Sequence, residues 1–126
     1  MSLQSAPSRR DFTPALEVAT IAAEIKVGRH HLARRIVEAT ADHFDLSIAQ
    51  LCGQRKLRSI CQARYIAAKL MCELTGLSTP EIGLKLGGKD HTTVLHNLHR
   101  ADELLVTNTL FRSDYEAIKA RIEAAE

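Results

Sequence analysis

Cysteine is scarce in this sequence, and its pattern excludes two common ways of holding a small protein together. The 126 residues include three cysteines, Cys52, Cys61 and Cys72. An odd number without a Cys-x-x-Cys pair argues against a disulfide framework and against a zinc ribbon. We therefore expect small buried thiols in a reducing compartment.

Long hydrophobic runs are also missing. A membrane-spanning helix needs roughly 20 apolar residues, whereas the best candidate, Val18 to Ile25, is short and includes Glu24. No apolar stretch of signal-peptide type precedes Asp11. We expect a cytoplasmic protein that makes no membrane contact.

Motifs for catalysis and for cofactors are absent as well. The chain has no Gly-x-x-x-x-Gly-Lys-Ser/Thr sequence, which many nucleotide-hydrolysing proteins use to hold phosphates. No carboxylate pair or Cys–His arrangement has an interpretable spacing, and nothing marks one serine as a nucleophile. His96 and His99 could share a metal ion, but a third ligand at a suitable spacing is missing. We predict a protein that is not an enzyme and holds no cofactor or metal.

What the sequence does have is an ordinary globular composition with unevenly placed charge. Apolar residues at 45% and charged residues at 25% predict one soluble domain with one core. Residues 54–100 hold eight basic and three acidic residues, a net charge of +5, whereas residues 101–126 hold three basic and six acidic residues, a net charge of −3. A basic middle beside an acidic tail favours one face that meets a polyanion.

Helical spacing of the apolar residues, with capping residues between the segments, predicts an all-α bundle of about six helices. Capping boxes begin at Ser47, Ser78 and Ser113, and Gly28 and Gly76 stand where helices end. We expect a flexible tail over residues 1–12, a short turn after Ser47, and helices over about 13–27, 31–44, 59–75, 79–86, 90–106 and from 113 onward.

Within this bundle, residues 78–106 have the outline of a helix-turn-helix: a short helix, a turn at Gly87 and Gly88, and a second helix. In such a motif the first residues of the second helix meet base edges in the major groove. Threonine and histidine can contact thymine methyls while offering hydrogen bonds, and aspartate can accept from the cytosine amino group. Here the second helix opens with five small or polar residues, Lys89 to Thr93.

The stretch Gly87 to His96, with the sequence GGKDHTTVLH, resembles the signature of the DNA-binding domain at the C-terminal end of the bacterial replication initiator DnaA. Upstream, Glu73 to Thr75 and Leu77 to Gly83 are similar to the same family in register. The resemblance covers roughly residues 32–122. It implies a Trp repressor-like helix-turn-helix domain over residues 32–126, preceded by an extra helix over residues 13–31, that binds a nine-base-pair duplex element, the DnaA box.

Carried over by position, the resemblance implies three sets of DNA-contacting residues. The base-reading set in the major groove is Arg64, Asp90, His91, Thr92 and Thr93. The basic-loop set is Lys56, where the family has an arginine that enters the minor groove, with Arg55 and Arg58 beside it. The phosphate-contacting set is Tyr65, Lys69, Ser78, Thr79, Pro80 and Lys89.

Several positions depart from the family pattern. Lys56 replaces an arginine, and a hydrated ammonium suits a narrow minor groove less well than a planar guanidinium. Tyr65 stands where glutamine is usual, Gln62 and Ala63 where arginine and proline are common, and Cys72 where a phosphate-contacting lysine is usual. We expect binding of a related box, with lower affinity or changed preference.

Two functions follow from these observations. The first is sequence-specific binding of duplex DNA, associated with the nucleoid, that regulates replication initiation or transcription without ATPase activity. The second is a protein-interaction module derived from such a domain, in which Lys56, Gln62 and Cys72 mark eroded DNA contacts. In that case the apolar helix Ala15 to Val27 docks another protein or a second copy of the chain.

Overall fold

The computed structural model describes residues 5–125, with side chains from residue 18 onward. In this part of the chain every regular element is helical, which confirms the all-α prediction. The helices are α1 (Ser5–His43), α2 (Ile48–Leu51), α3 (Arg58–Thr75), α4 (Thr79–Lys85), α5 (His91–Thr107) and α6 (Thr109–Ala124). None of these described helices is both long enough and apolar enough to cross a bilayer.

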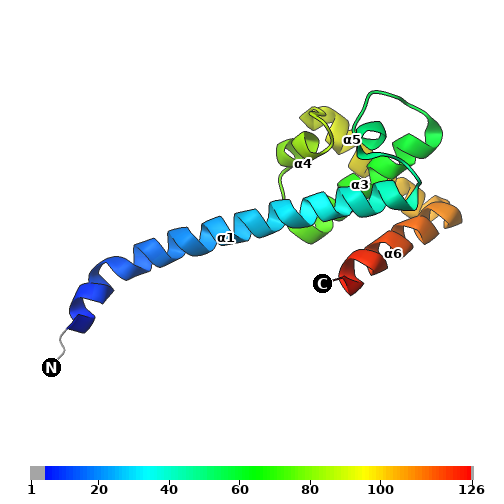
Figure 1. Cartoon of the computed structure of the whole chain (residues 1–126). Coiled ribbons are helices and arrows are strands. Elements are labelled where there is room, and N and C mark those ends of the chain that lie inside the picture. Colours follow the sequence, from blue (N-terminus) through cyan, green and yellow to red (C-terminus); the bar gives the residue numbers. More distant parts are fainter. Residues whose placement is uncertain (1–4, 126) are drawn as a thin grey trace.

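The core lies where α3 meets the second half of α1, α5 and α6 (Figure 1). Fully buried side chains from each of these helices form one cluster, among them Ile36, Ile66, Leu70, Val94 and Ile118. The core holds α4 and α5, the two helices of the helix-turn-helix, against α3.

The N-terminal region differs from its prediction. Two helices separated at Gly28 were expected, but α1 is continuous through this residue, and it already includes residues 5–12 of the predicted tail. Residues 1–4 lie outside the described part. A glycine inside a helix costs only about 1 kcal/mol relative to alanine, and Gly28 lacks the left-handed backbone found at Gly76. It therefore does not end the helix.

The first part of α1 extends away from the other helices (Figure 1). Its described side chains over residues 18–29 are exposed, including Val18, Ile21, Ile25 and Val27. The helix begins at Ser5 rather than near residue 13, so Pro14 lies inside it.

Capping residues set most of the other boundaries as predicted. Ser47 and Ser78 each form a capping box, the first with Gln50 and the second with Glu81. The last helix is a correction: it begins at Thr109, because the side chain of Asn108 caps it, so the predicted start near Ser113 lies inside α6. A helix that starts earlier also buries Phe111, which the prediction did not place in the core.

The burial of the cysteines also differs from its prediction. They are free thiols, but Cys52 and Cys61 are only half buried and Cys72 is exposed. Partial burial raises the pKa of the Cys52 thiol, and this effect exceeds the opposing effect of the nearby Lys89 charge.

Candidate nucleic-acid interface

The turn between α4 and α5 depends on glycine. Gly87 and Gly88 have φ values of 87° and 83°, in the left-handed region that favours glycine. A Cβ atom on Gly87 would lie 2.2 Å from the carbonyl oxygen of Cys52. The carbonyl of Gly83 accepts hydrogen bonds from the backbone of Gly88 at 3.0 Å and of Lys89 at 2.9 Å. These contacts fix where α5 starts relative to α4 and to the end of α2.

The exposed start of α5 carries the predicted base-reading residues. Asp90 is the N-cap: its Oδ1 accepts from the backbone N–H groups of Thr92 at 2.5 Å and Thr93 at 3.2 Å. His91 Nδ1 shares a 2.7 Å hydrogen bond with Thr79 Oγ1 at the start of α4. The side chains of His91, Thr92 and Thr93 are exposed. The tip of α5 is therefore rigidly capped, while its side chains face the solvent.

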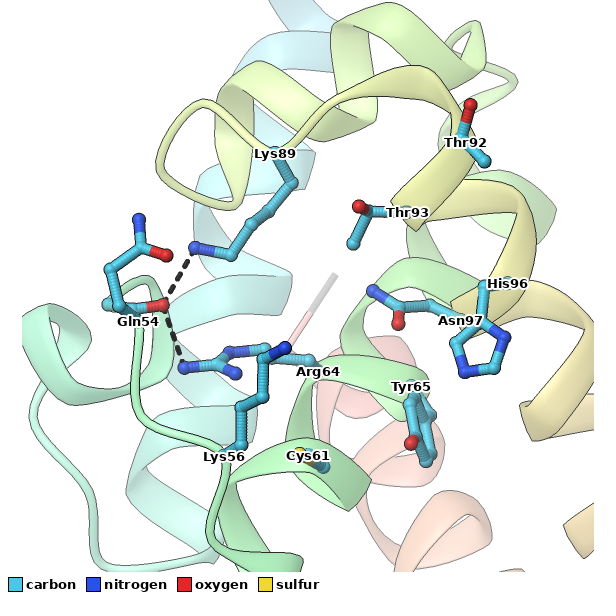
Figure 2. Close-up of a pocket in the computed structure, with 11 residues that line it drawn as sticks. Gln54, Lys56, Cys61, Arg64, Tyr65, Lys89, Thr92, Thr93, His96 and Asn97 are labelled. Atoms are coloured by element: carbon cyan, nitrogen blue, oxygen red, sulfur yellow. Dashed lines mark hydrogen bonds between the residues drawn. The ribbon is translucent and has the colours of Figure 1, made fainter.

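A cavity of about 550 Å³ lies beside this tip, between α5, α3 and the loop that follows α2. Figure 2 shows side chains from all three segments turned toward it. The cavity is lined by Gly53, Gln54, Lys56, Cys61, Arg64, Tyr65, Lys89, Thr92, Thr93, His96 and Asn97. Tertiary packing thus brings Thr92 and Thr93 together with Lys56 from the basic loop.

Arg64, which is predicted to read a base, is turned into the protein. Its side chain is buried, with 6% of its surface exposed. The Nε group donates to the carbonyl of Leu51 at 2.7 Å, and Nη2 donates to the carbonyls of Gly53 at 2.8 Å and Gln50 at 3.4 Å. Its donors are thus used to fasten the end of α2 and the following loop to α3.

Lys89, a predicted phosphate contact, is likewise turned inward. Its ammonium donates to the carbonyl of Cys52 at 2.9 Å. It also donates to the carbonyl of Gly53 at 2.7 Å, and this bond is the dashed line from Lys89 in Figure 2. Loss of solvent, helped by the charge of Arg64, lowers the pKa of this ammonium. Two cations thus converge on the carbonyl of Gly53, and together they hold the basic loop against the start of α5.

Lys69 is the third predicted DNA contact whose side chain is already paired within the protein. Its ammonium lies 2.7 Å from a carboxylate oxygen of Asp102 and 3.5 Å from one of Glu73. The hydrogen bond to Asp102 is the main reason that the pKa of Lys69 is raised. A phosphate contact by Lys69 therefore requires that its ammonium first leave these two carboxylates.

The basic loop itself holds the unpaired cations. Arg55, Lys56 and Arg58 are exposed, and no carboxylate in the described part of the chain lies within ion-pair distance of them. The side chain of Lys56 reaches into the cavity in Figure 2. Among the described residues, these three cations are therefore free to meet a polyanion.

The remaining predicted phosphate contacts lie at the edges of the same face. Ser78 Oγ donates to Glu81 Oε1 at 2.9 Å in the cap of α4, and Pro80 is exposed beside it. Hydrogen bonds from Ser78, first from its backbone N–H, lower the pKa of Glu81. Tyr65 is half buried, and its ring packs edge-on against His96 at 6.4 Å between centroids.

Asn97 and His96 line the cavity as well, although the sequence analysis did not place them at a DNA contact. The sequence signal that points to Asn97 is helical spacing. Asn97 follows Thr93 by four residues, so both lie on the same face of α5. In the described residues, no three side chains of the metal-binding types are gathered at one place.

Comparisons with known proteins agree with this geometry. The family described as "Bacterial dnaA protein helix-turn-helix" matches residues 33–100. The chain is 42% identical over 87 residues to the chromosomal replication initiator protein DnaA of Thermomicrobium roseum, covering 69% of this chain and 19% of that protein. It is 34% identical over 103 residues to the DnaA of Ruegeria pomeroyi, covering 82% of this chain and 21% of that protein. The chain thus spans about a fifth of the length of these relatives.

Proposed function

Because the chain belongs to the bacterial DnaA helix-turn-helix family, we propose that it binds duplex DNA at a specific sequence related to the DnaA box. By occupying such sites on the nucleoid it regulates replication initiation or transcription, and it does so without hydrolysing ATP. The observation that carries this proposal is the exposed tip of α5, with His91, Thr92 and Thr93, beside the unpaired cation Lys56.

In the proposed complex, α5 enters the major groove with its first turn. His91, Thr92 and Thr93 contact base edges there, because these are the exposed residues at the start of the second helix. Asp90 uses Oδ1 for the cap, so its other carboxylate oxygen accepts from a cytosine amino group. The start of α4, with Ser78, Thr79 and Pro80, lies along the phosphates.

The basic loop supplies the remaining attraction in this proposal. Lys56 leaves the cavity and enters the neighbouring minor groove, while Arg55 and Arg58 meet phosphates on either side. The two inward cations, Arg64 and Lys89, keep the loop and α5 at a fixed separation, since both are bonded to the carbonyl of Gly53.

The salt dependence of the affinity measures how many cations of the protein contact the DNA. If Arg55, Lys56 and Arg58 are the only cations that displace counterions from the DNA, log K should fall against log salt with a slope near −3. If Arg64, Lys69 and Lys89 also leave their intramolecular partners, the slope should be near −5. A titration of a labelled duplex at several salt concentrations distinguishes these cases.

Binding-site selection from random duplexes is the decisive experiment. We expect enrichment of one sequence related to the DnaA box, and tighter binding of that duplex than of a scrambled one. Failure to enrich any sequence, with equal affinity for both duplexes, would reject the proposed function.

Matched variants then separate base reading from attraction to the backbone. Thr92→Ala should weaken binding of the selected duplex by about 1–3 kcal/mol and leave binding of scrambled DNA nearly unchanged. Lys56→Ala should weaken both by a similar factor, because a charge acts on every phosphate backbone. If Thr92→Ala weakens both equally, Thr92 does not read a base.

A second candidate function is self-association through the first part of α1. Val18, Ile21 and Ile25 are spaced by three and four residues, and they are 66%, 54% and 49% exposed. A stripe at this spacing is the pattern by which two helices pack in a coiled coil. Light scattering of the full chain tests this candidate: a dimer that Ile21→Glu converts to a monomer supports it, and a monomer at all concentrations rejects it.

A further inference from the structure

Asn97 is a buried polar residue in the middle of the proposed DNA-binding face. Only 5% of its surface is exposed, and it lies on the wall of the cavity. Among buried side-chain nitrogen and oxygen atoms in the described part of the chain, its Nδ2 is the one without a hydrogen-bond partner. Burying an unpaired amide is unfavourable, so the free chain gains no stability from the NH₂ group at this position.

The position of the amide indicates where a partner would come from. In Figure 2 the amide of Asn97 is turned toward the space between Arg64, Tyr65 and Thr93. Lys56 extends into the same cavity from the opposite side and has no carboxylate partner among the described residues. When Lys56 moves to the minor groove, this space opens next to the base-reading tip. The last torsion of an asparagine side chain is soft, so the amide can then turn toward a ligand.

Resting on the proposed duplex binding, we propose that Asn97 reads one base pair of the site, by contacting an adenine. Its amide offers a donor and an acceptor side by side, and adenine presents the matching pair in the major groove. Nδ2 donates to N7 of the base, and Oδ1 accepts from the N6 amino group.

The geometry of α5 also predicts which base pair this is. Asn97 follows Thr93 by four residues, which is a rise of about 6 Å along the helix. Successive base pairs are about 3.4 Å apart. The adenine therefore lies one or two base pairs beyond the base that Thr93 contacts, on the side toward which α5 runs.

Parallel site selection with the full-length wild-type chain and Asn97→Ala tests the proposal. We expect the wild type to prefer adenine at one position and Asn97→Ala to lose that preference, with the rest of the selected sequence unchanged. Affinity for the selected duplex should fall roughly 5- to 100-fold, whereas affinity for scrambled DNA should stay the same. Since alanine removes an unpaired buried amide and favours a helix, the melting temperature of Asn97→Ala should equal or exceed that of the wild type.

Two further variants sharpen the outcome. The carboxylate of Asn97→Asp offers only acceptors. This variant should therefore prefer cytosine, which exposes an amino donor, in place of adenine. His99→Ala, an exposed change on the same helix, is the control and should keep the wild-type selection.

The failures of the two proposals are distinguishable. If the wild type enriches a site and Asn97→Ala selects the identical sequence, Asn97 does not read a base, while the proposed function stands. If the folded wild type enriches no sequence at all, both the proposed function and the role of Asn97 are rejected.

Discussion

Replacing Arg64 tests whether this side chain reads DNA or holds the loop that meets it. Its guanidinium makes two short hydrogen bonds, to the carbonyls of Leu51 and Gly53 at 2.7 and 2.8 Å. A hydrogen bond to a charged group contributes about 1.5–3 kcal/mol. In Arg64→Ala, the carbonyl of Leu51 loses this donor, whereas that of Gly53 keeps Lys89. We expect a loss of about 3–4 kcal/mol in the free energy of unfolding.

Thermal unfolding followed by circular dichroism measures this loss. For a chain of this length, the expected fall in Tm is roughly 10–15 °C. Arg64→Lys should lie between the wild type and Arg64→Ala, because a single ammonium cannot reproduce the planar fork that spans several carbonyls. Arg58→Ala is the matched control: this arginine is exposed, and its removal should change stability by no more than about 0.5 kcal/mol.

DNA binding by the same variants, at a temperature at which each is folded, distinguishes the two roles. If Arg64 anchors the loop, Arg64→Ala should weaken binding to the selected duplex and to scrambled DNA by the same factor. An unchanged Tm, together with a loss of affinity confined to the selected duplex, would refute this reasoning and support the predicted base contact of Arg64.

Three other predictions concern the turn, the cap of α4 and the first part of α1. Gly87→Ala combines left-handed strain of about 1–2 kcal/mol with a Cβ position 2.2 Å from the Cys52 carbonyl, whereas Gly88→Ala carries the strain without a neighbour within 4 Å. Denaturant unfolding should therefore show a larger loss for Gly87→Ala, and equal losses would contradict the turn geometry. The lowered pKa of Glu81 means that its ionised form stabilises the fold above the ordinary glutamate pKa of 4.5, and that this stability is lost as the pH falls through the lower folded-state value. Between about pH 6 and pH 3, the Tm of the wild type should thus fall by more than the Tm of Glu81→Gln. Superimposable Tm–pH curves would show that the ionised cap has no effect on stability. A chain that starts at Arg29 should stay folded and bind DNA, because side chains 18–29 are exposed; loss of its helical circular dichroism would show that the removed segment supports the core.

Local sequence signals predicted much of this fold. The capping boxes at Ser47 and Ser78 and the left-handed Gly76 depend on hydrogen bonds and backbone angles within a few residues, so they can be identified without the rest of the molecule. The local signals gave wrong boundaries at three places. The helix expected from about residue 13 begins at Ser5, and Gly28 was predicted to end a helix that continues through it. Asn108 caps a helix that was expected to start near Ser113.

By itself, the sequence determined the all-α class, the helix-turn-helix and the polar tip of its second helix, because these follow from helical spacing and from contacts between near neighbours. Only the tertiary structure decided which basic residues are available to DNA. Arg64 and Lys89 are held by backbone carbonyls at Leu51 to Gly53, and Lys69 is held by Asp102, 33 positions further along the chain. A cation is available to a phosphate only if no acceptor of its own chain lies within hydrogen-bond distance. Packing decides which acceptors lie that close, and the spacing of residues along the sequence does not reveal it.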